Sequence, residues 1–323
     1  KVWAYKGETT DDYYKYITNV ISQKPDITID DGCDLVSEIH KNHTKMIPEL
    51  IAGCEETTTG IIRLKAMERD KALKYPVIAV NDNKTKHLLD NYYGTGQSTF
   101  DGILRATNML VAGKTAVIAG YGSCGKGTSM RARGLGANVI VTEVNHFRAL
   151  QAKYDGFRVM PMEQAAPLGD LFITVTGNKH VIRMEHIKKM KDGATVANSG
   201  HFDIEIDVKS LRKESTKTTR VRPSLEEFTI NGKRIYLAGE GRLVNLAAAE
   251  GHPSEVMATS FCGQALAVEY AVKNKEGLKP EVIQLPEEID DHIAKLQLEA
   301  LGVKIDIMTP EQVKYMESWE EGT

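Results

Sequence analysis

Short apolar runs alternate along this chain with longer segments in which apolar positions recur at helical spacing. This alternation is typical of parallel strands joined by helices that cover both faces of a sheet. We therefore predict an α/β fold built on a doubly wound parallel sheet. The predicted strands span residues 27–29, 77–80, 115–119, 138–142, 171–174, 195–197 and 235–238.

Two further helices are predicted in the last quarter of the chain. Residues 254–274 have a helical period, and Met257, Phe261, Ala265 and Leu266 form an apolar face that we expect to be buried or to form an interface. Thr309, followed by a proline and acidic residues, has the pattern of a helix N-cap.

One region breaks the pattern. Residues 216–228 are polar and basic and lack a clear period, so we predict a surface excursion between two strands. Asn231 and Gly232, which follow it, predict a tight turn.

The length of 323 residues is enough for about two domains. The chain contains no repeat, low-complexity tract or long linker, so a domain boundary must lie in a short crossover. The glycine-containing segments 94–97 and 250–253 are the best candidates.

Composition narrows the functional classes. Apolar residues make up 41% of the chain and charged residues 26%, with no apolar run long enough to span a membrane. A net charge of −3 and the lack of a basic stripe argue against nucleic acid and membranes as partners. The four cysteines have no zinc-ligand spacing, so we predict reduced thiols and no metal site. No secretory segment begins the sequence, so we expect a cytoplasmic location.

The strongest local signal is the loop from Gly120 to Gly125, which follows an apolar strand and precedes a helix-forming stretch. In a Rossmann-type domain the first glycine allows the turn, the second lets a pyrophosphate approach the backbone, and the third lets the helix pack closely. Amides at the helix start face the anion. The sequence therefore predicts a dinucleotide-binding loop of Gly120, Gly122 and Gly125.

Glu143 ends the next predicted strand, near the distance beyond the loop at which such domains carry an acid. A carboxylate there accepts hydrogen bonds from both ribose hydroxyls of the adenosine half and repels a 2′-phosphate, which favours NAD over NADP. A plain strand-turn-helix corner and a solvated strand end are the alternative interpretations.

Polar residues also gather where other predicted strands end. Asp30 and Asp31 follow one strand, and Glu55, Glu56 and three threonines follow further on, at the edge where open α/β sheets bind ligands. Taken alone, a solvated turn explains the aspartates equally well, and a helix cap or strand edge explains the threonines.

Lys86 and Asp90 lie four residues apart after the strand at 77–80. On a surface helix this spacing is a weak salt bridge. In a cleft the same pair could relay a proton, with Lys86 held neutral long enough to accept one from a hydroxyl.

Three groups follow later strands and complete the rim of the predicted site. His201 follows the strand at 195–197 and is placed beside the nicotinamide edge, although any single histidine is more often structural. Asn245 and His252 are expected to add hydrogen-bonding groups.

Taken in order, these motifs resemble the S-adenosyl-L-homocysteine hydrolase family over nearly the whole chain. The strings that carry the resemblance are AYKGET from residue 4, DDG from 30, EETTTG from 55, VND from 80, GYGSCGKG from 120, GHFDIEID from 200, EGRLVNL from 240 and GHPS from 251. Several of these strings are not shared by other Rossmann proteins.

The resemblance implies an enzyme that holds NAD tightly and regenerates it in each turnover. It implies oxidation of a ribose 3′-hydroxyl to a ketone, loss of the acidified C4′ proton with elimination of homocysteine, addition of water to the 4′,5′-alkene, and reduction back. The implied substrate is S-adenosyl-L-homocysteine, and the implied assembly is a homotetramer.

Residue roles are implied in the same way. Lys86 and Asp90 resemble the pair that acts at the 3′-hydroxyl, aided by His201, while Asp31 resembles the acid and base at C4′ and C5′ and Glu56 the anchor of ribose hydroxyls. These four acidic and basic residues, Asp31, Glu56, Lys86 and Asp90, would also bind substrate. The implied NAD contacts are Thr57, Thr58, Thr59 and Asn91 on the substrate side, Gly120, Gly122, Gly125, Lys126, Gly127 and Glu143 at the loop, and Ser199, Gly200, His201, Asn245 and His252 at the nicotinamide.

The resemblance also predicts the domain organisation. Residues 1–96 would form a substrate domain whose N-terminal part, on the order of one hundred residues, is absent from this sequence, as is the family's Lys/Tyr-bearing C-terminal tail. Residues 97–251 would form the NAD domain, and 252–323 helices that return to the substrate domain and an oligomer interface.

Three alternatives stay open from the sequence. The substrate could carry inosine in place of adenosine. A 2-hydroxyacid dehydrogenase shares the loop and the two-domain plan, but it releases NADH and does not need Asp31, Glu56 and Lys86 together. A catalytically incomplete NAD-binding subunit is the third alternative.

Overall fold

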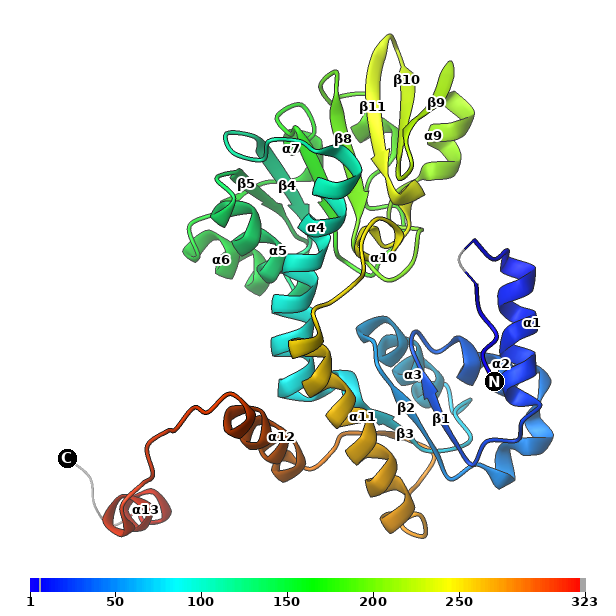
Figure 1. Cartoon of the computed structure of the whole chain (residues 1–323), viewed down its shortest axis with the longest axis vertical. Coiled ribbons are helices and arrows are strands. Elements are labelled where there is room, and N and C mark those ends of the chain that lie inside the picture. The colour runs from blue at the N-terminus through cyan, green and yellow to red at the C-terminus, as the bar shows by residue number, and fades with distance from the viewer. Residues whose placement is uncertain (6, 320–323) are drawn as a thin grey trace.

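The computed structural model describes residues 1–5 and 7–319 and contains two sheets (Figure 1). The small sheet has the order β1-β2-β3-β12, and all its pairings are parallel. Its strands are β1 (Ile27–Asp30), β2 (Ala52–Glu55), β3 (Val77–Ala79) and β12 (Val282–Ile283). The last strand brings the C-terminal part of the chain back to the sheet that the N-terminal part forms.

The large sheet has the order β6-β5-β4-β7-β8-β11-β10-β9. Its strands are β4 (Thr115–Ala119), β5 (Asn138–Thr142), β6 (Arg158–Val159), β7 (Leu171–Thr174), β8 (Ala194–Asn198), β9 (Lys217–Arg222), β10 (Leu225–Ile230) and β11 (Lys233–Ala238). From β6 to β11 all neighbours pair in parallel. The predicted doubly wound α/β fold is thereby confirmed.

Residues 216–228 are not a surface excursion, and that prediction is wrong. They form β9 and most of β10, which pair antiparallel with each other, and β10 also pairs antiparallel with β11. All six residues of β9 are exposed at the edge of the sheet, so the strand has no apolar period to reveal it. The predicted turn is confirmed: Asn231 and Gly232 have φ of 51° and 76° and join β10 to β11.

Helices cover both faces of the large sheet, and alternate residues of its strands point to opposite cores. In β4, Ile118 packs in the core that includes Phe100 and Ile103, whereas Val117 packs with Phe172 on the other face. The helices of this part are α4 (Thr95–Thr107), α5 (Ser123–Gly134), α6 (His146–Tyr154), α7 (Met162–Ala165), α8 (Met184–Ile187), α9 (Val208–Glu214) and α10 (Val244–Ala247). The short 3-10 helix η4 (Gly239–Gly241) precedes α10.

The small sheet has its own core around Val36, Ile39, Leu64 and Val77. Its helices are α1 (Thr10–Ile21), α2 (Asp34–Asn42) and α3 (Thr58–Arg69), with the 3-10 helices η1 (Thr44–Glu49) and η2 (Val80–Asp82) and the π-helix η3 (Thr85–Gly94). The chain passes from η3 directly into α4, which leads to the large sheet (Figure 1).

The long helix predicted at 254–274 is confirmed as α11 (Ser254–Asn274), which returns from the large sheet to the small one (Figure 1). Of the two possibilities given for the apolar face, burial within the chain does not hold, because Phe261 is 59% exposed, and the interface stays a prediction. Small and polar residues are buried instead: Thr259, Ser260, Gly263, Gln264, Ala267 and Ala271. They allow close packing on the segment at Val80 and Asn83, which a Cβ at Gly263 would approach to 3.2 Å.

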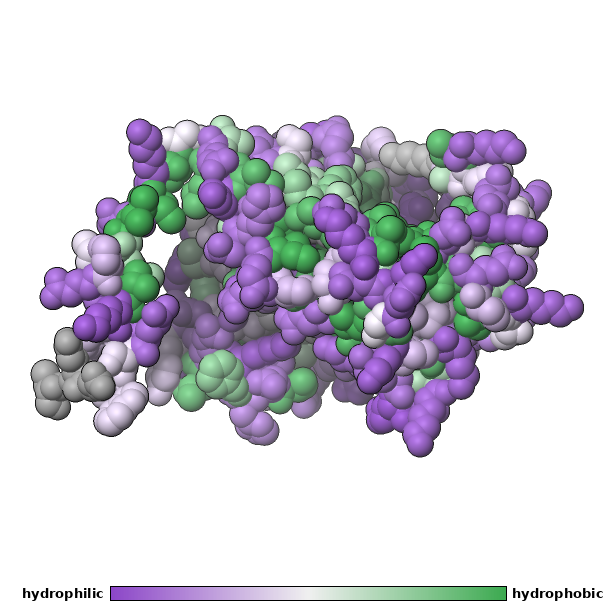
Figure 2. All heavy atoms as spheres, turned by 90° about the horizontal axis from the view of Figure 1, so that it is seen from below, coloured by the Kyte–Doolittle hydropathy of each residue, from purple (hydrophilic) through white to green (hydrophobic). Residues whose placement is uncertain are grey.

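The C-terminal segment extends away from both sheets and contains α12 (Glu287–Ala300) and α13 (Pro310–Glu317) (Figure 1). Thr309 caps α13 as predicted, and its Oγ1 accepts a hydrogen bond from Gln312 N at 3.3 Å. Apolar side chains such as Ile307 and Trp319 are exposed here. Figure 2 shows apolar and polar side chains mixed on its left side. Within the described part of the chain, no helix has the length and apolar character needed to cross a membrane.

Candidate functional site

The polar loops that follow strands of the two sheets meet each other. Asp31 follows β1, and its Oδ1 lies 4.0 Å from Nδ1 of His201, which follows β8 of the other sheet. Thr59, at the start of α3, lies beside Gly177 in the loop after β7, where an added Cβ would lie 3.3 Å from the threonine Oγ1. Residues far apart in the sequence therefore form one site between the carboxyl edges of both sheets.

Lys86 lies at the centre of a buried polar cluster of Glu56, Lys86, Asp90, Asn91 and His252. Its Nζ donates to Asn91 Oδ1 at 2.8 Å and lies 3.4 Å from Asp90 Oδ2 and 3.5 Å from Glu56 Oε1. A π-helical turn is wider than an α-helical one, so η3 presents residues i+4 and i+5 together to Lys86. Lys86 is 5% and Asp90 2% exposed, which excludes the surface salt bridge left open above.

The charged groups of this cluster stabilise one another because they lie in direct contact. Burial alone lowers the pKa of Lys86, but the carboxylates of Asp90 and Glu56 outweigh burial and raise it. Burial raises the pKa of Asp90, but its hydrogen bond with His252 and the charge of Lys86 outweigh that and lower it. The cluster therefore holds an ammonium beside carboxylates. The neutral amine that the proton-relay interpretation needs is therefore not the resting form of Lys86, because two acids contact one lysine.

Two side chains of α11 hold Glu56. Ser260 Oγ donates to Glu56 Oε1, and Gln264 Nε2 donates to Glu56 Oε2. The sequence analysis did not find these two residues, and no local signal distinguishes them from other polar residues on a helix. Only the packing of α11 against the small sheet reveals their position.

The two histidines predicted at the rim have separate partners. The resemblance implies that His201 aids Lys86 and Asp90, but the structure places His252 against Asp90 and His201 against the turn at Asp31. His201 also packs on Gly32, where a Cβ would meet its Nε2. The side chain of Asp31 itself is 67% exposed.

The threonine segment begins α3. Thr57 is the N-cap, and its Oγ1 accepts from Gly60 N at 2.8 Å, so the helix-cap interpretation is correct for this residue. Thr58 Oγ1 donates to Asn81 Oδ1 at 3.3 Å, and Asn91 Nδ2 donates to the same oxygen at 3.1 Å. Asn81, which the sequence analysis did not select, thus links the threonine segment to the Lys86 cluster.

The glycine loop has the geometry predicted for it. Gly120 turns the chain out of β4 with φ of +106°, and the position of a Cβ at Gly122 is open except for the Arg148 guanidinium at 3.6 Å. At Gly125 a Cβ would lie 2.1 Å from Gly120 O, so this glycine permits the helix to pack on the loop. Gly127 permits α5 to pack closely on Tyr92, whose carbonyl oxygen would lie 1.8 Å from a Cβ at this position.

The residues around this loop fit NAD. Helix α5 begins at Ser123, so the amides of its first three residues have no partner within the helix, whereas the amide of the half-buried Lys126 donates to Gly122 O at 2.9 Å. The side chain of Glu143 contacts the loop, and its Oε2 accepts a hydrogen bond from Tyr121 N at 2.7 Å. Asn245 donates to Ser98 Oγ at 3.2 Å, but its buried Oδ1 has no hydrogen-bond partner among the described residues. A carboxamide N–H would satisfy that oxygen.

Ser199 and Gly200 shape the loop after β8. Ser199 Oγ is 2.5 Å from Thr99 Oγ1 of α4, and Gly200 N donates to Asn198 Oδ1 at 2.8 Å. A Cβ at Gly200 would overlap the Glu205 carboxylate. The structure thus gives both residues a packing role at the place where the sequence predicts cofactor contacts.

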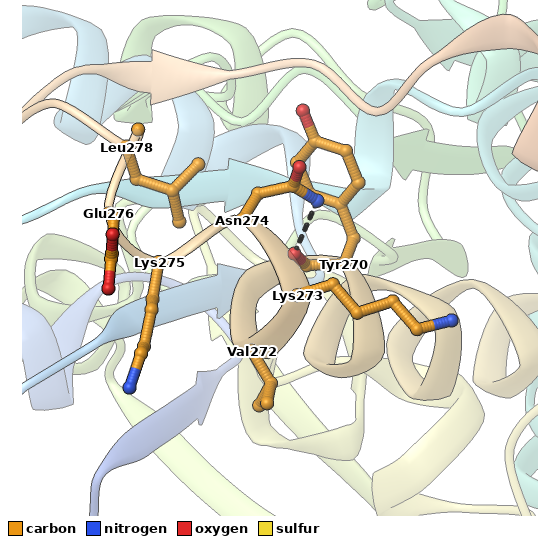
Figure 3. A pocket seen from close by; sticks show the side chains of 8 residues that line it. Tyr270, Val272, Lys273, Asn274, Lys275, Glu276 and Leu278 are labelled. Carbon is orange, nitrogen blue, oxygen red and sulfur yellow. Dashed lines mark hydrogen bonds between the residues drawn. The ribbon is translucent and has the colours of Figure 1, made fainter.

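A hollow at the C-terminal end of α11 has a different character (Figure 3). Asn274 Nδ2 donates to Tyr270 O at 2.9 Å, while Lys273 and Lys275 point away from each other. Its polar groups do not converge on a common point, so this hollow is not the candidate site.

Comparison with known proteins identifies the family. The model of the family described as "S-adenosyl-L-homocysteine hydrolase, NAD binding domain" matches residues 91–251. The whole chain is 59% identical to S-inosyl-L-homocysteine hydrolase of Methanocaldococcus jannaschii and covers 78% of it. It is 57% identical to adenosylhomocysteinase of Aquifex aeolicus, covering 77%, and 59% identical to that of Thermosynechococcus vestitus, covering 75%. With its NAD-binding loop, its Lys86 cluster and this identity over its full length, the chain belongs to the S-adenosyl-L-homocysteine hydrolase family.

Proposed function

We propose that this protein catalyses the reversible hydrolysis of S-adenosyl-L-homocysteine to adenosine and homocysteine. The observation that carries the proposal is the buried Lys86, held between Glu56 and Asp90 at the cleft that the NAD-binding loop also borders. Bound NAD supplies a hydride acceptor for the 3′-carbon and a hydride donor at the end, which leaves no net redox change.

The side chains of this chain manage the protons. Lys86 takes the proton of the 3′-hydroxyl after its ammonium has passed one proton along the contacts from Lys86 through Asp90 to His252. Glu56, fixed by α11, accepts hydrogen bonds from ribose hydroxyls. These groups position the sugar with its 3′-carbon toward the dinucleotide.

Asp31 acts as the base in the next step, the elimination of homocysteine. Once the 3′-carbon is a ketone, the C4′ proton passes to Asp31, its electron pair forms the C4′–C5′ double bond, and the C5′–S bond breaks. The departing homocysteine sulfur takes a proton, and water then adds across the same double bond. The exposed side chain of Asp31 and the nearby His201 support this assignment.

The purine base of the substrate needs its own test, because one relative is named for an inosine compound and two are named for an adenosine compound. We expect the NAD-loaded protein to release homocysteine from S-adenosyl-L-homocysteine with no net NADH, measured by thiol titration and absorbance. Faster release from S-inosyl-L-homocysteine would favour the inosine substrate. Stoichiometric NADH would indicate a simple dehydrogenase, and no product from either compound would indicate an NAD-binding subunit without turnover.

We further propose that the protein forms a homotetramer. Phe261 and Val272 expose apolar surface on α11, and Ile307, Met316 and Trp319 expose more on the C-terminal segment. Exposed apolar surface of this extent is typical of subunit interfaces. We expect light scattering to give four times the mass of the chain, and a monomer at micromolar concentration would contradict this.

A further inference from the structure

Glu55, the last residue of β2, is fully buried and accepts four hydrogen bonds from two loops of the site. Its Oε1 accepts from Gly32 N at 2.7 Å, and its Oε2 accepts from Cys33 N at 3.0 Å. Oε1 also accepts from Thr57 N at 3.1 Å and from Thr57 Oγ1 at 2.9 Å. One carboxylate therefore joins the turn that carries Asp31 to the N-cap of α3.

The surroundings are built for this carboxylate. At Gly60 an added Cβ would lie 2.1 Å from the Glu55 carboxyl carbon, so α3 approaches Glu55 closely only because that residue is glycine. Burial, with the neighbouring charge of Asp30, raises the pKa of Glu55 to about 7. The four donors thus compensate only part of the cost of burying the charge. An apolar residue would avoid that cost, which argues for a role beyond packing.

The turn that Glu55 holds has an unusual conformation. Gly32 has φ of +115° and Cys33 φ of +65°, the left-handed region that non-glycine residues rarely adopt. Two of the three backbone amides that donate to Glu55 belong to these residues, so the carboxylate stabilises this conformation directly. The conformation of this turn then fixes the position of Asp31 beside His201.

We infer that Glu55 is a positioning residue for the acid–base step at C4′ and C5′, acting through the Asp31 turn; the inference rests on the proposed function. Among the described residues its side-chain hydrogen bonds all go to the Asp31 turn and Thr57, and none goes to Lys86 or Asp90. Removing one of its acceptor oxygens should therefore affect the two half-reactions unequally.

The large sheet offers a matched comparison. Glu205 is also buried, and its carboxylate accepts from Thr176 N at 3.0 Å, Thr176 Oγ1 at 2.8 Å and Gly177 N at 2.6 Å. It anchors a loop of the NAD domain and has no bond to the Asp31 turn. Glu205→Gln therefore removes an equivalent buried anchor in the other half of the site.

The test compares Glu55→Gln, Glu55→Asp and Glu205→Gln in the NAD-loaded protein. Adenosine reports 3′-oxidation through the absorbance of the reduced cofactor, and exchange of the C4′ proton with deuterium from solvent reports the Asp31 step. For Glu55→Gln we expect cofactor reduction within a fewfold of wild type and C4′ exchange slowed about 100-fold, the scale of a misplaced catalytic group. Glu205→Gln should instead weaken NAD binding, measured by calorimetry, without slowing exchange more than oxidation.

Glu55→Asp keeps the charge but withdraws the carboxylate by one methylene, so it should show the same inequality and serves if the glutamine variant does not fold. Equal slowing of both steps, or of neither, in a folded Glu55 variant would overturn the inference alone. A wild-type protein that shows neither cofactor reduction nor exchange would overturn the proposed function, and this inference with it.

Discussion

Lys86→Ala should abolish reduction of bound NAD by nucleoside, with a loss of at least about 1,000-fold in the rate, within the range for removal of a positioned acid–base group. The ammonium contacts both Glu56 and Asp90, and no other lysine or arginine ion pair to these carboxylates occurs among the described residues. The measurement is the single-turnover absorbance change of the cofactor after nucleoside is added.

The variant should remain folded, because each carboxylate keeps a partner. Asp90 retains His252, and Glu56 retains Ser260 and Gln264. Lys65→Ala is the matched control, since Lys65, in α3, forms an exposed ion pair with Asp82 at 3.2 Å. Cofactor reduction at the wild-type rate in Lys86→Ala would remove that residue from the mechanism.

Gly127→Ala should destabilise the protein by about 3 kcal/mol and weaken NAD binding. A Cβ at this position would lie 1.8 Å from Tyr92 O, which is backbone of η3 and cannot move without shifting the π-helix. Such overpacking typically costs about 1–3 kcal/mol and sometimes more. The shift would displace α5, and with it the glycine loop, relative to the helix that carries Lys86. Urea denaturation and calorimetric titration with NAD measure both effects.

Gly134→Ala in the same helix provides the control. A Cβ there has no heavy atom within 4 Å, and α5 ends at this residue. Replacing a helical glycine by alanine at an unobstructed site should stabilise the protein by up to about 1 kcal/mol. If both variants changed the free energy of unfolding equally, the contact between α5 and η3 would not be the cause.

Local sequence patterns predicted the parts of the fold in which neighbouring residues determine the structure. The glycine loop at 120–125, the turn at Asn231 and Gly232, and the N-cap at Thr309 all have the predicted conformations. Strands β4, β5 and β7 also have the predicted bounds. Each depends on backbone propensities or on a short apolar run, which the chain specifies over a few residues.

Predictions failed where a residue's surroundings come from elsewhere in the chain. Strand β2 was not predicted because its short run contains Gly53 and ends in the buried Glu55. The face of α11 that is buried within the chain was not foreseen, because small and polar residues, rather than large apolar ones, pack against η3. In both cases a distant element determines what is buried.

By itself, the sequence determined the α/β class, the NAD-binding loop and the set of acidic and basic residues available for catalysis. Whether Lys86 and Asp90 form a solvated pair or a buried one depended on the small sheet, α11 and His252 all closing around η3. Only the tertiary structure decided this, because the ionisation of a side chain depends on the charges and solvent within a few ångströms of it. In this protein those neighbours lie as many as 162 residues away along the chain.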